Sequence, residues 1–146
     1  MTLFTILKSI CDHIKTVFPA QPIYIMQVPQ GFKRPSFFVS LVDSTDRDLC
    51  QNGIRRQAVF EVVHFAQQDA KGVTNPVTQF AAYERLMQIF QVQSLPVEDR
   101  YLKITRVDGS TRDNEVYLTI SFEYTFTPDL NPVDLELMQQ LSMNYQ

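Results

Sequence analysis

Residues 116–126 read VYLTISFEYTF and carry the most regular pattern in the chain. Large apolar residues stand at every second position from Val116 to Phe126, and mostly polar residues stand between them. A period of two places alternate side chains on opposite faces of a β-strand. The stretch therefore predicts a strand with one face on an apolar core and the other mostly polar, which is typical of an antiparallel sheet covered on one side.

Four further segments have the composition of strands. They are residues 23–28, 37–42, 55–65 and 101–107, which are short and rich in β-branched or aromatic residues. The first two flank the turn-rich residues 29–35 and are expected to pair as a hairpin. Asp108-Gly109 is a hairpin signal and predicts the turn before the last strand. The polar residues 43–53 indicate either a loop or the tip of a long hairpin.

Two segments have the apolar spacing of amphipathic helices. Residues 2–17 place apolar side chains three and four positions apart, and Pro19 ends this pattern. Asn75-Pro76 predicts the start of a second helix, with Pro76 at its first position, that runs to about residue 91. Its expected apolar stripe comprises Phe80, Tyr83, Leu86, Met87, Ile89 and Phe90.

The order of these elements predicts the fold class. Asn131-Pro132 indicates a short helix near the C-terminus, so that the order is α-β-β-β-α-β-β-α. We expect an α+β fold with a mostly antiparallel five-stranded sheet and helices on one face. Residues 1–127 are expected to form a single α+β domain, and residues 128–146 a C-terminal extension.

Composition and charge argue against several classes of function. The chain has 146 residues and a formal net charge of −3, which argues against recognition of nucleic acid or an anionic membrane. Its four glycines are too far apart for a dinucleotide fingerprint, a Walker A loop or a nucleophile elbow. No stretch reaches the roughly 18 to 20 apolar residues of a membrane helix. The two cysteines form no C-x-x-C pair, which indicates reduced thiols inside a cell.

Candidate catalytic groups are few. Cys11 and His13 stand two positions apart and would point to different sides of a helix, so they are not expected to act as a pair. His64 alternates with Phe60 and Val62, which places it among apolar neighbours near a strand end. No metal-ligand spacing is present, and the sequence predicts no metal, no cofactor and no enzymatic activity. A small cytosolic enzyme or ligand-binding module that uses His64 stays open as an alternative.

Two features suggest contact with other proteins. Residues 23–28 and 37–42 carry large apolar groups on both faces, which indicates either central strands covered by helices or a subunit contact. An aromatic residue among cations is typical of a docking surface, although a solvated hairpin end has the same composition. Such a set is formed by Gly31, Phe32, Lys33 and Arg34 together with Arg55 and Arg56. A second candidate contact consists of Leu135, Met138, Leu141 and Tyr145 in the C-terminal segment, which would either pack on its own sheet or bind a neighbouring molecule.

The run Gln27-Val28-Pro29-Gln30-Gly31-Phe32-Lys33-Arg34-Pro35-Ser36-Phe37-Phe38-Val39 resembles a stretch found in small tail proteins of Gram-positive phages and prophages. The similar pattern extends over most of residues 1–126. It includes the helix before the run, the Arg-led strand after it and the later helix with its hairpin. In these features the chain is similar to the tail terminator, or tail completion, proteins of long-tailed phages and phage-tail-like particles.

The resemblance implies a structural role in virion assembly. It implies a homo-oligomeric ring, commonly a hexamer, that caps the tail tube, ends tube polymerisation and prepares the tail for head joining. The implied partners are the chain itself, the tail tube protein, and sheath and neck proteins. The implied place is the bacterial host cytoplasm during assembly and then the head-proximal end of the particle. A neck or head–tail connector component is the alternative within the same structural class.

Overall fold

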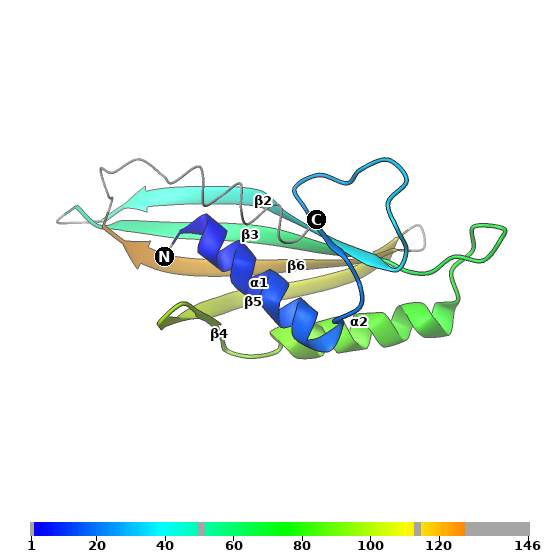
Figure 1. Ribbon diagram of the computed structural model, residues 1–146. Coiled ribbons are helices and arrows are strands. Elements are labelled where there is room, and N and C mark those ends of the chain that lie inside the picture. Colours follow the sequence, from blue (N-terminus) through cyan, green and yellow to red (C-terminus); the bar gives the residue numbers. More distant parts are fainter. Residues whose placement is uncertain (1, 50–51, 113–114, 128–146) are drawn as a thin grey trace.

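The computed structural model describes residues 2–49, 52–112 and 115–127. These residues form two helices and six strands (Figure 1). The elements are α1 (Leu3–Val17), β1 (Ile23–Ile25), β2 (Ser36–Asp48), β3 (Ile54–Phe65), α2 (Pro76–Phe90), β4 (Ser94–Val97), β5 (Arg100–Arg112) and β6 (Glu115–Phe126). The strands form one sheet in the order β1-β2-β3-β6-β5-β4. The predicted α+β class is confirmed.

Both helices begin at residues that cap them. The Thr2 hydroxyl accepts a hydrogen bond from the Thr5 amide at 3.2 Å, and the Thr2 amide donates to the Thr5 hydroxyl at 2.9 Å. The Asn75 side chain accepts a hydrogen bond from the Val77 amide at 2.9 Å, with Pro76 at the first helical position. These bonds satisfy amide groups that a helix leaves free in its first turn. The predicted positions of both helices are confirmed.

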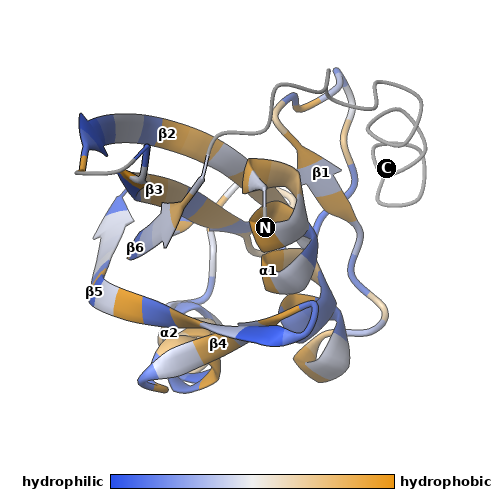
Figure 2. Cartoon of the chain, turned by 90° about the vertical axis from the view of Figure 1, so that its left-hand side faces the viewer, coloured by the Kyte–Doolittle hydropathy of each residue, from blue (hydrophilic) through white to orange (hydrophobic). Residues whose placement is uncertain are grey.

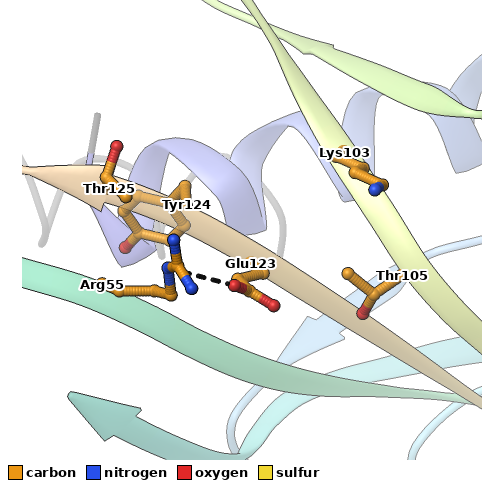
Figure 3. A pocket seen from close by; sticks show the side chains of 6 residues that line it. All are labelled: Arg55, Lys103, Thr105, Glu123, Tyr124 and Thr125. Carbon is orange, nitrogen blue, oxygen red and sulfur yellow. Dashed lines mark ion pairs between the residues drawn. The ribbon is translucent and has the colours of Figure 1, made fainter. Parts of the chain in front are cut away.

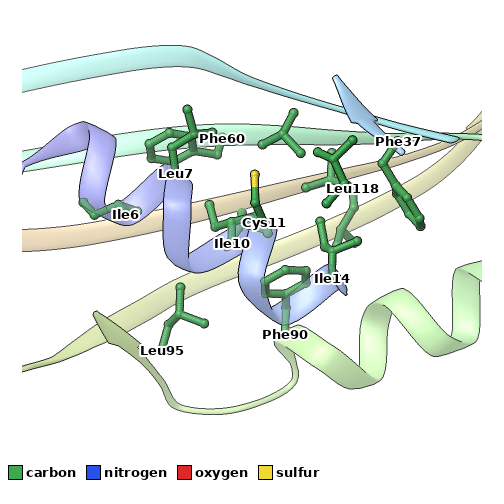
Figure 4. Packing of buried hydrophobic residues seen from close by; sticks show 14 of the residues in the cluster. Ile6, Leu7, Ile10, Cys11, Ile14, Phe37, Phe60, Phe90, Leu95 and Leu118 are labelled. Atoms are coloured by element: carbon green, nitrogen blue, oxygen red, sulfur yellow. The ribbon is translucent and has the colours of Figure 1, made fainter. Parts of the chain in front are cut away.

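The core lies on one face of the sheet, formed by alternate residues of the strands. On β6 these are the buried Val116, Leu118, Ile120 and Phe122, as the period of two predicted. The curled sheet holds α1 in its concave side, and α2 lies on the same side (Figures 1 and 2). Figure 4 shows side chains from α1, α2 and four strands meeting there. The described helices therefore cover one face of the sheet.

The sheet is mostly antiparallel, as predicted, but it has six strands instead of five and its first pair of strands is parallel. β1 pairs with β2 in parallel, with Tyr24 opposite Phe38, because residues 26–35 carry the chain back before β2 begins. The expected hairpin between these two strands is therefore absent. A sixth strand, β4, pairs antiparallel with the outer side of β5. It contains Pro96, which has no backbone N–H to donate and is tolerated at the edge of a sheet.

The predicted turn at Asp108-Gly109 is also wrong. Both residues lie within β5, where Asp108 pairs with Thr119 and Gly109 pairs with Leu118. The glycine is needed for packing, because a Cβ atom at residue 109 would lie 2.6 Å from the Tyr83 hydroxyl oxygen on α2. The ring of Tyr83 thus takes the place that a side chain at residue 109 would occupy.

Of the polar residues 43–53, those that the structure describes belong to a long hairpin formed by β2 and β3. β2 continues to Asp48 and pairs with β3 along its whole length, from Ser36 opposite Phe65 to Asp48 opposite Ile54. The register shifts between Leu41 and Asp43, and the residues of β2 beyond this shift are exposed. This hairpin extends one end of the sheet past the core (Figure 1).

Candidate functional site

Residues 26–35, between β1 and β2, contain most of the motif run, and we call them the motif loop. This loop folds back onto the sheet face opposite the helices. The ring of Phe32 lies 4.6 Å from that of Phe65 and 6.3 Å from that of Tyr24, measured between centroids. The Lys33 amide donates a hydrogen bond to the Tyr24 hydroxyl at 3.2 Å. Phe32 is therefore partly covered by its own chain, although the sequence places it among the candidates for a docking surface.

Arg34 connects the motif loop to two other strands. Its guanidinium lies 5.2 Å from the centroid of Phe32 and 5.4 Å from that of Phe65. It donates one hydrogen bond to the Ala66 carbonyl and forms an ion pair with Glu115 Oε1, both at 3.1 Å. The side chains of Arg34 and Glu115 are only 22% and 12% exposed. Gly31 and Lys33 are thus the exposed members of the predicted set in this loop.

Arg55 and Arg56 lie at the opposite end of β3. Arg56 donates two hydrogen bonds to the Asp46 carboxylate, at 2.7 and 2.9 Å, and lies 4.6 Å from the centroid of Phe126. These bonds lower the pKa of Asp46 and raise that of Arg56. Arg55 pairs with Glu123 at 3.2 Å and stays about half exposed. Both arginines therefore have acidic partners within the chain.

The six predicted residues form two surfaces rather than one. Arg34 contacts Phe65, the last residue of β3, whereas Arg55 is the second residue of that strand. Ten residues of strand at ~3.3 Å each separate these positions by about 33 Å. A partner that contacts both surfaces must span the length of the sheet.

A shallow hollow of about 280 Å³ lies beside Arg55. Lys103, Thr105, Glu123, Tyr124 and Thr125 line it together with Arg55 (Figure 3). Figure 3 shows that these side chains come from three adjacent strands, with the Arg55–Glu123 ion pair between two of them. The sequence predicted that β5 pairs with β6, but it did not predict that β3 lies on the other side of β6, because that neighbour depends on strand order.

His64 is a packed residue of the core face. Its ring lies 4.7 Å from that of Phe37, and its Nε2 lies 3.0 Å from the Gln21 side-chain oxygen. Burial, with a smaller contribution from the positive charge of Arg34, lowers the pKa of His64 to about 4. The hollow near Arg55 and a second one before α2 are lined by other residues. The geometry thus gives no support to a site built on His64.

A model of the phage tail terminator protein family matches residues 5–134, which is most of the chain. The chain belongs to the phage tail terminator family. The resemblance seen in the motif run is thereby confirmed. The comparison with curated proteins found no match.

The family is one of structural proteins of the phage tail. Among the described residues, no cluster of three His, Cys, Asp or Glu side chains could hold a metal ion. In the same part of the chain, no helix is long and apolar enough to cross a membrane.

The sequence placed one aromatic residue of helix α2, Phe80, on the wrong side of the helix. Phe80 was expected in the apolar stripe of α2, but it is 62% exposed, and Val77 beside it is 76% exposed. At about 100° per residue, Phe80 lies about 120° and Val77 about 180° around the helix from the buried Leu86. A narrower stripe through Ala82, Leu86 and Phe90 would have shown that Phe80 and Val77 face away from the core.

The candidate C-terminal contact lies outside the described residues. It comprises Leu135, Met138, Leu141 and Tyr145, together with the predicted C-terminal helix. The family match ends at residue 134, just before these four residues.

Proposed function

We propose that the protein assembles into a ring, a hexamer, that caps the tail tube, ends tube polymerisation and prepares the tail for joining to the head. The observation that carries the proposal is the family match over residues 5–134. The proposed partners are other copies of this chain, the tail tube protein, and sheath and neck proteins. The proposed location is the head-proximal end of the particle, after assembly in the bacterial host cytoplasm.

The two surfaces at the ends of β3 support a ring. A ring forms when one patch of each subunit binds a different patch of the next, and the rotation closes. The surface with Gly31 and Lys33 lies about 33 Å from the surface with Arg55. We propose that these two surfaces face different neighbours, either adjacent copies or the tube.

Electron microscopy of particles that lack the protein tests the role in tube growth. We expect tubes that are longer than in the wild type, because nothing ends their polymerisation. Tails of normal length without heads would contradict this role and favour a neck or connector component. Complementation with the wild-type gene is the control.

Light scattering after size-exclusion chromatography tests the ring. We expect a mass that is a whole multiple of 16.9 kDa, six for a hexamer, in the purified protein or when it is bound to isolated tubes. A monomer at all concentrations, with no ring on isolated tubes, would contradict the proposal.

A further inference from the structure

The long strands β2 and β5 each have an open stretch on their outer side. β1 pairs only with residues 37–39 of β2, and β4 only with residues 100–103 of β5. In the part of the chain that the structure describes, no strand lies on the outer side of residues 43–48 or 106–112. We call these two stretches the β2 edge and the β5 edge. An open edge presents unpaired backbone groups, on which a strand of another chain can pair.

The backbone bonds next to each edge show which residues face outward. On β2 the Val39 carbonyl accepts a hydrogen bond from the Met26 amide, and on β5 the Ile104 amide donates to the Gln93 carbonyl. Val39 and Ile104 therefore face the outer side, and their alternation continues past one register shift in each strand. The outward residues that follow are Ser44, Asp46 and Asp48 on the β2 edge and Val107, Gly109 and Thr111 on the β5 edge.

The strand directions of the two edges are compatible in a ring. β2, β3, β6 and β5 are successive antiparallel neighbours, so β5 runs opposite to β2. When the sheet of one copy continues into the sheet of the next, β5 of the first copy therefore meets β2 of the second in antiparallel orientation. Antiparallel strands form the slightly more stable kind of pair.

The two edges also agree in the faces to which their side chains point. Thr45 lies opposite Gln57 of β3, and Ser110 lies opposite Tyr117 of β6. Gln57 and Tyr117 alternate with buried core residues, so they lie on the face away from the helices. Thr45 and Ser110 thus point to the same face of the sheet, and so do the edge residues two positions from each of them.

Helix α2 leaves the β5 edge accessible. The ring of Tyr83 lies against Gly109 from the helix-covered face, and Gln79 donates a hydrogen bond to the Glu115 carbonyl of β6. The helix therefore packs under β5 and β6 and not beyond the outer side of β5 (Figure 1). Every residue of the β2 edge is exposed, and so is every residue of the β5 edge except Val107.

One register pairs all the outward residues of the two edges. It places Ser44 opposite Thr111, Asp46 opposite Gly109 and Asp48 opposite Val107. A slip of two residues in either direction leaves one outward residue of each edge without its partner. The full register is therefore the one that forms the most backbone hydrogen bonds.

The same register brings opposite charges together on the face away from the helices. It places Asp43 opposite Arg112 and Arg47 opposite Asp108. Among the described residues neither Asp43 nor Arg112 has an ion-pair partner. Asp108 pairs with Arg106 but stays 50% exposed, so it can accept a second cation. A slip of two residues in one direction would instead place Arg47 opposite Arg106, and like charges in this position are unfavourable.

We propose that the β5 edge of one copy pairs antiparallel with the β2 edge of the next copy in the ring, with Asp43 opposite Arg112 and Arg47 opposite Asp108. This inference rests on the proposed ring and names the strands that join its subunits. The contact joins two different surfaces, as a cyclic ring of this kind requires. The two edges lie at opposite ends of the sheet, so the strands must tilt relative to the ring axis, as they do in closed sheets.

Charge swaps in the purified full-length protein test the register. Asp43→Arg and Arg112→Asp should each weaken assembly at least about fivefold, measured by light scattering over a dilution series, because each places like charges opposite one another. The double variant should recover most of this loss. Asp99→Arg is the matched control, because Asp99 is exposed but lies between β4 and β5, outside both edges. Circular dichroism should show that all variants are folded, and additive losses in the double variant would overturn the register.

Disulfide trapping tests which edges meet. In a Cys50→Ser background, Thr45→Cys protein mixed with Ser110→Cys protein should form a mixed disulfide faster than either variant forms one with itself. Ser44→Cys is the matched control for Thr45→Cys, because its side chain points to the other face, and it should cross-link more slowly. Within one molecule β3 and β6 lie between Thr45 and Ser110, so a disulfide inside the chain is excluded.

The outcomes separate this proposal from the proposed function. If the wild type forms a ring but Asp43→Arg assembles normally and no mixed disulfide forms, the ring stands and the edge pairing fails. Faster pairing of Thr45→Cys with itself would overturn the proposal, because two β2 edges would then meet. Protection of Thr45→Cys from a thiol reagent in diluted, monomeric protein would overturn it too, because the chain's own residues 128–146 would then cover the β2 edge. A wild type that stays monomeric even on isolated tubes would overturn both.

Discussion

The guanidinium of Arg34 and the carboxylate of Glu115 form an ion pair at 3.1 Å, although 81 residues separate them in the sequence. The pair joins the loop before β2 to the first residue of β6. Arg34 also donates to the Ala66 carbonyl, just after β3, so one side chain connects three parts of the sheet. This arrangement gives the motif loop a defined position on the sheet.

Replacement of Arg34 should destabilise the fold. Arg34→Ala leaves Glu115 and the Ala66 carbonyl without their partner, and we expect a loss of about 1–3 kcal/mol in the free energy of unfolding. Urea denaturation measures this loss. Lys33→Ala, in the same loop but exposed, is the control and should change stability by less than about 0.5 kcal/mol. Equal stability of the two variants would contradict the role given to Arg34.

Charge reversal at Lys33 should impair function without unfolding the protein. The side chain of Lys33 is exposed, and only its backbone amide bonds to Tyr24, so Lys33→Glu should keep the wild-type denaturation midpoint. If the loop contacts a neighbour or the tube, tail length or assembly should change, as measured by electron microscopy of complemented particles. Tails of normal length would show that Lys33 lies outside the contact.

A side chain at residue 109 should disturb the packing of α2 on β5. The Cβ atom of Gly109→Ala would lie 2.6 Å from the Tyr83 hydroxyl oxygen and 2.8 Å from Cζ, so the ring must move. We expect a loss of stability of about 1–3 kcal/mol, as for other overpacked sites. In a double-mutant cycle, Tyr83→Ala should remove most of this loss, since it removes the ring. Additive losses would exclude the clash as the cause.

Burial of His64 should make stability depend on pH. The folded protein binds a proton at His64 only near pH 4, whereas the unfolded chain binds one near pH 6.5. Between these values the unfolded state holds more protons, so the free energy of unfolding falls as the pH falls. The fall has a maximal slope of about 1.4 kcal/mol per pH unit. Denaturation of His64→Gln between pH 4 and 7 should show a smaller slope than the wild type; an unchanged slope would contradict this account.

The thiol of Cys11 should be unreactive in the folded protein. Burial in the core, with a smaller contribution from Asp12, raises its pKa to about 12, so the thiolate is scarce at neutral pH. In a Cys50→Ser background, Cys11 is the only thiol and should react with a thiol reagent only after unfolding. Rapid reaction of the folded protein at pH 7.5 would show that α1 opens from the sheet.

The sequence predicted correctly those elements whose signals lie in neighbouring residues. The alternation in residues 116–126 predicted β6, and Asn75-Pro76 predicted the start of α2, because strand period and helix capping are properties of neighbouring residues. Asp108-Gly109 misled because its glycine is required by the ring of Tyr83 and not by a turn. β4 was missed because it has four residues, one of which is Pro96.

The candidate site was less predictable because its contacts are distant in the sequence. Phe32 and Arg34 have the composition of a docking surface, but Phe65 and Glu115 cover part of them, and only the strand order brings these residues together. The reverse holds for Phe80, which was assigned to the core yet faces outward. The residue type alone does not tell whether an aromatic side chain on a short apolar helix faces the core or the solvent.

The contacts of Phe32 and Arg34 also bear on the thermodynamics of any binding event at Gly31 and Lys33. A loop that must become ordered on binding loses conformational entropy, at about 1–2 kcal/mol for each residue fixed. Here the Lys33 amide donates a hydrogen bond to the Tyr24 hydroxyl in the unbound protein. The side chain of Arg34, the next residue, is fixed by its bonds to the Ala66 carbonyl and Glu115. A partner would therefore meet a preorganised surface, and binding would not lose the conformational entropy of ordering this loop.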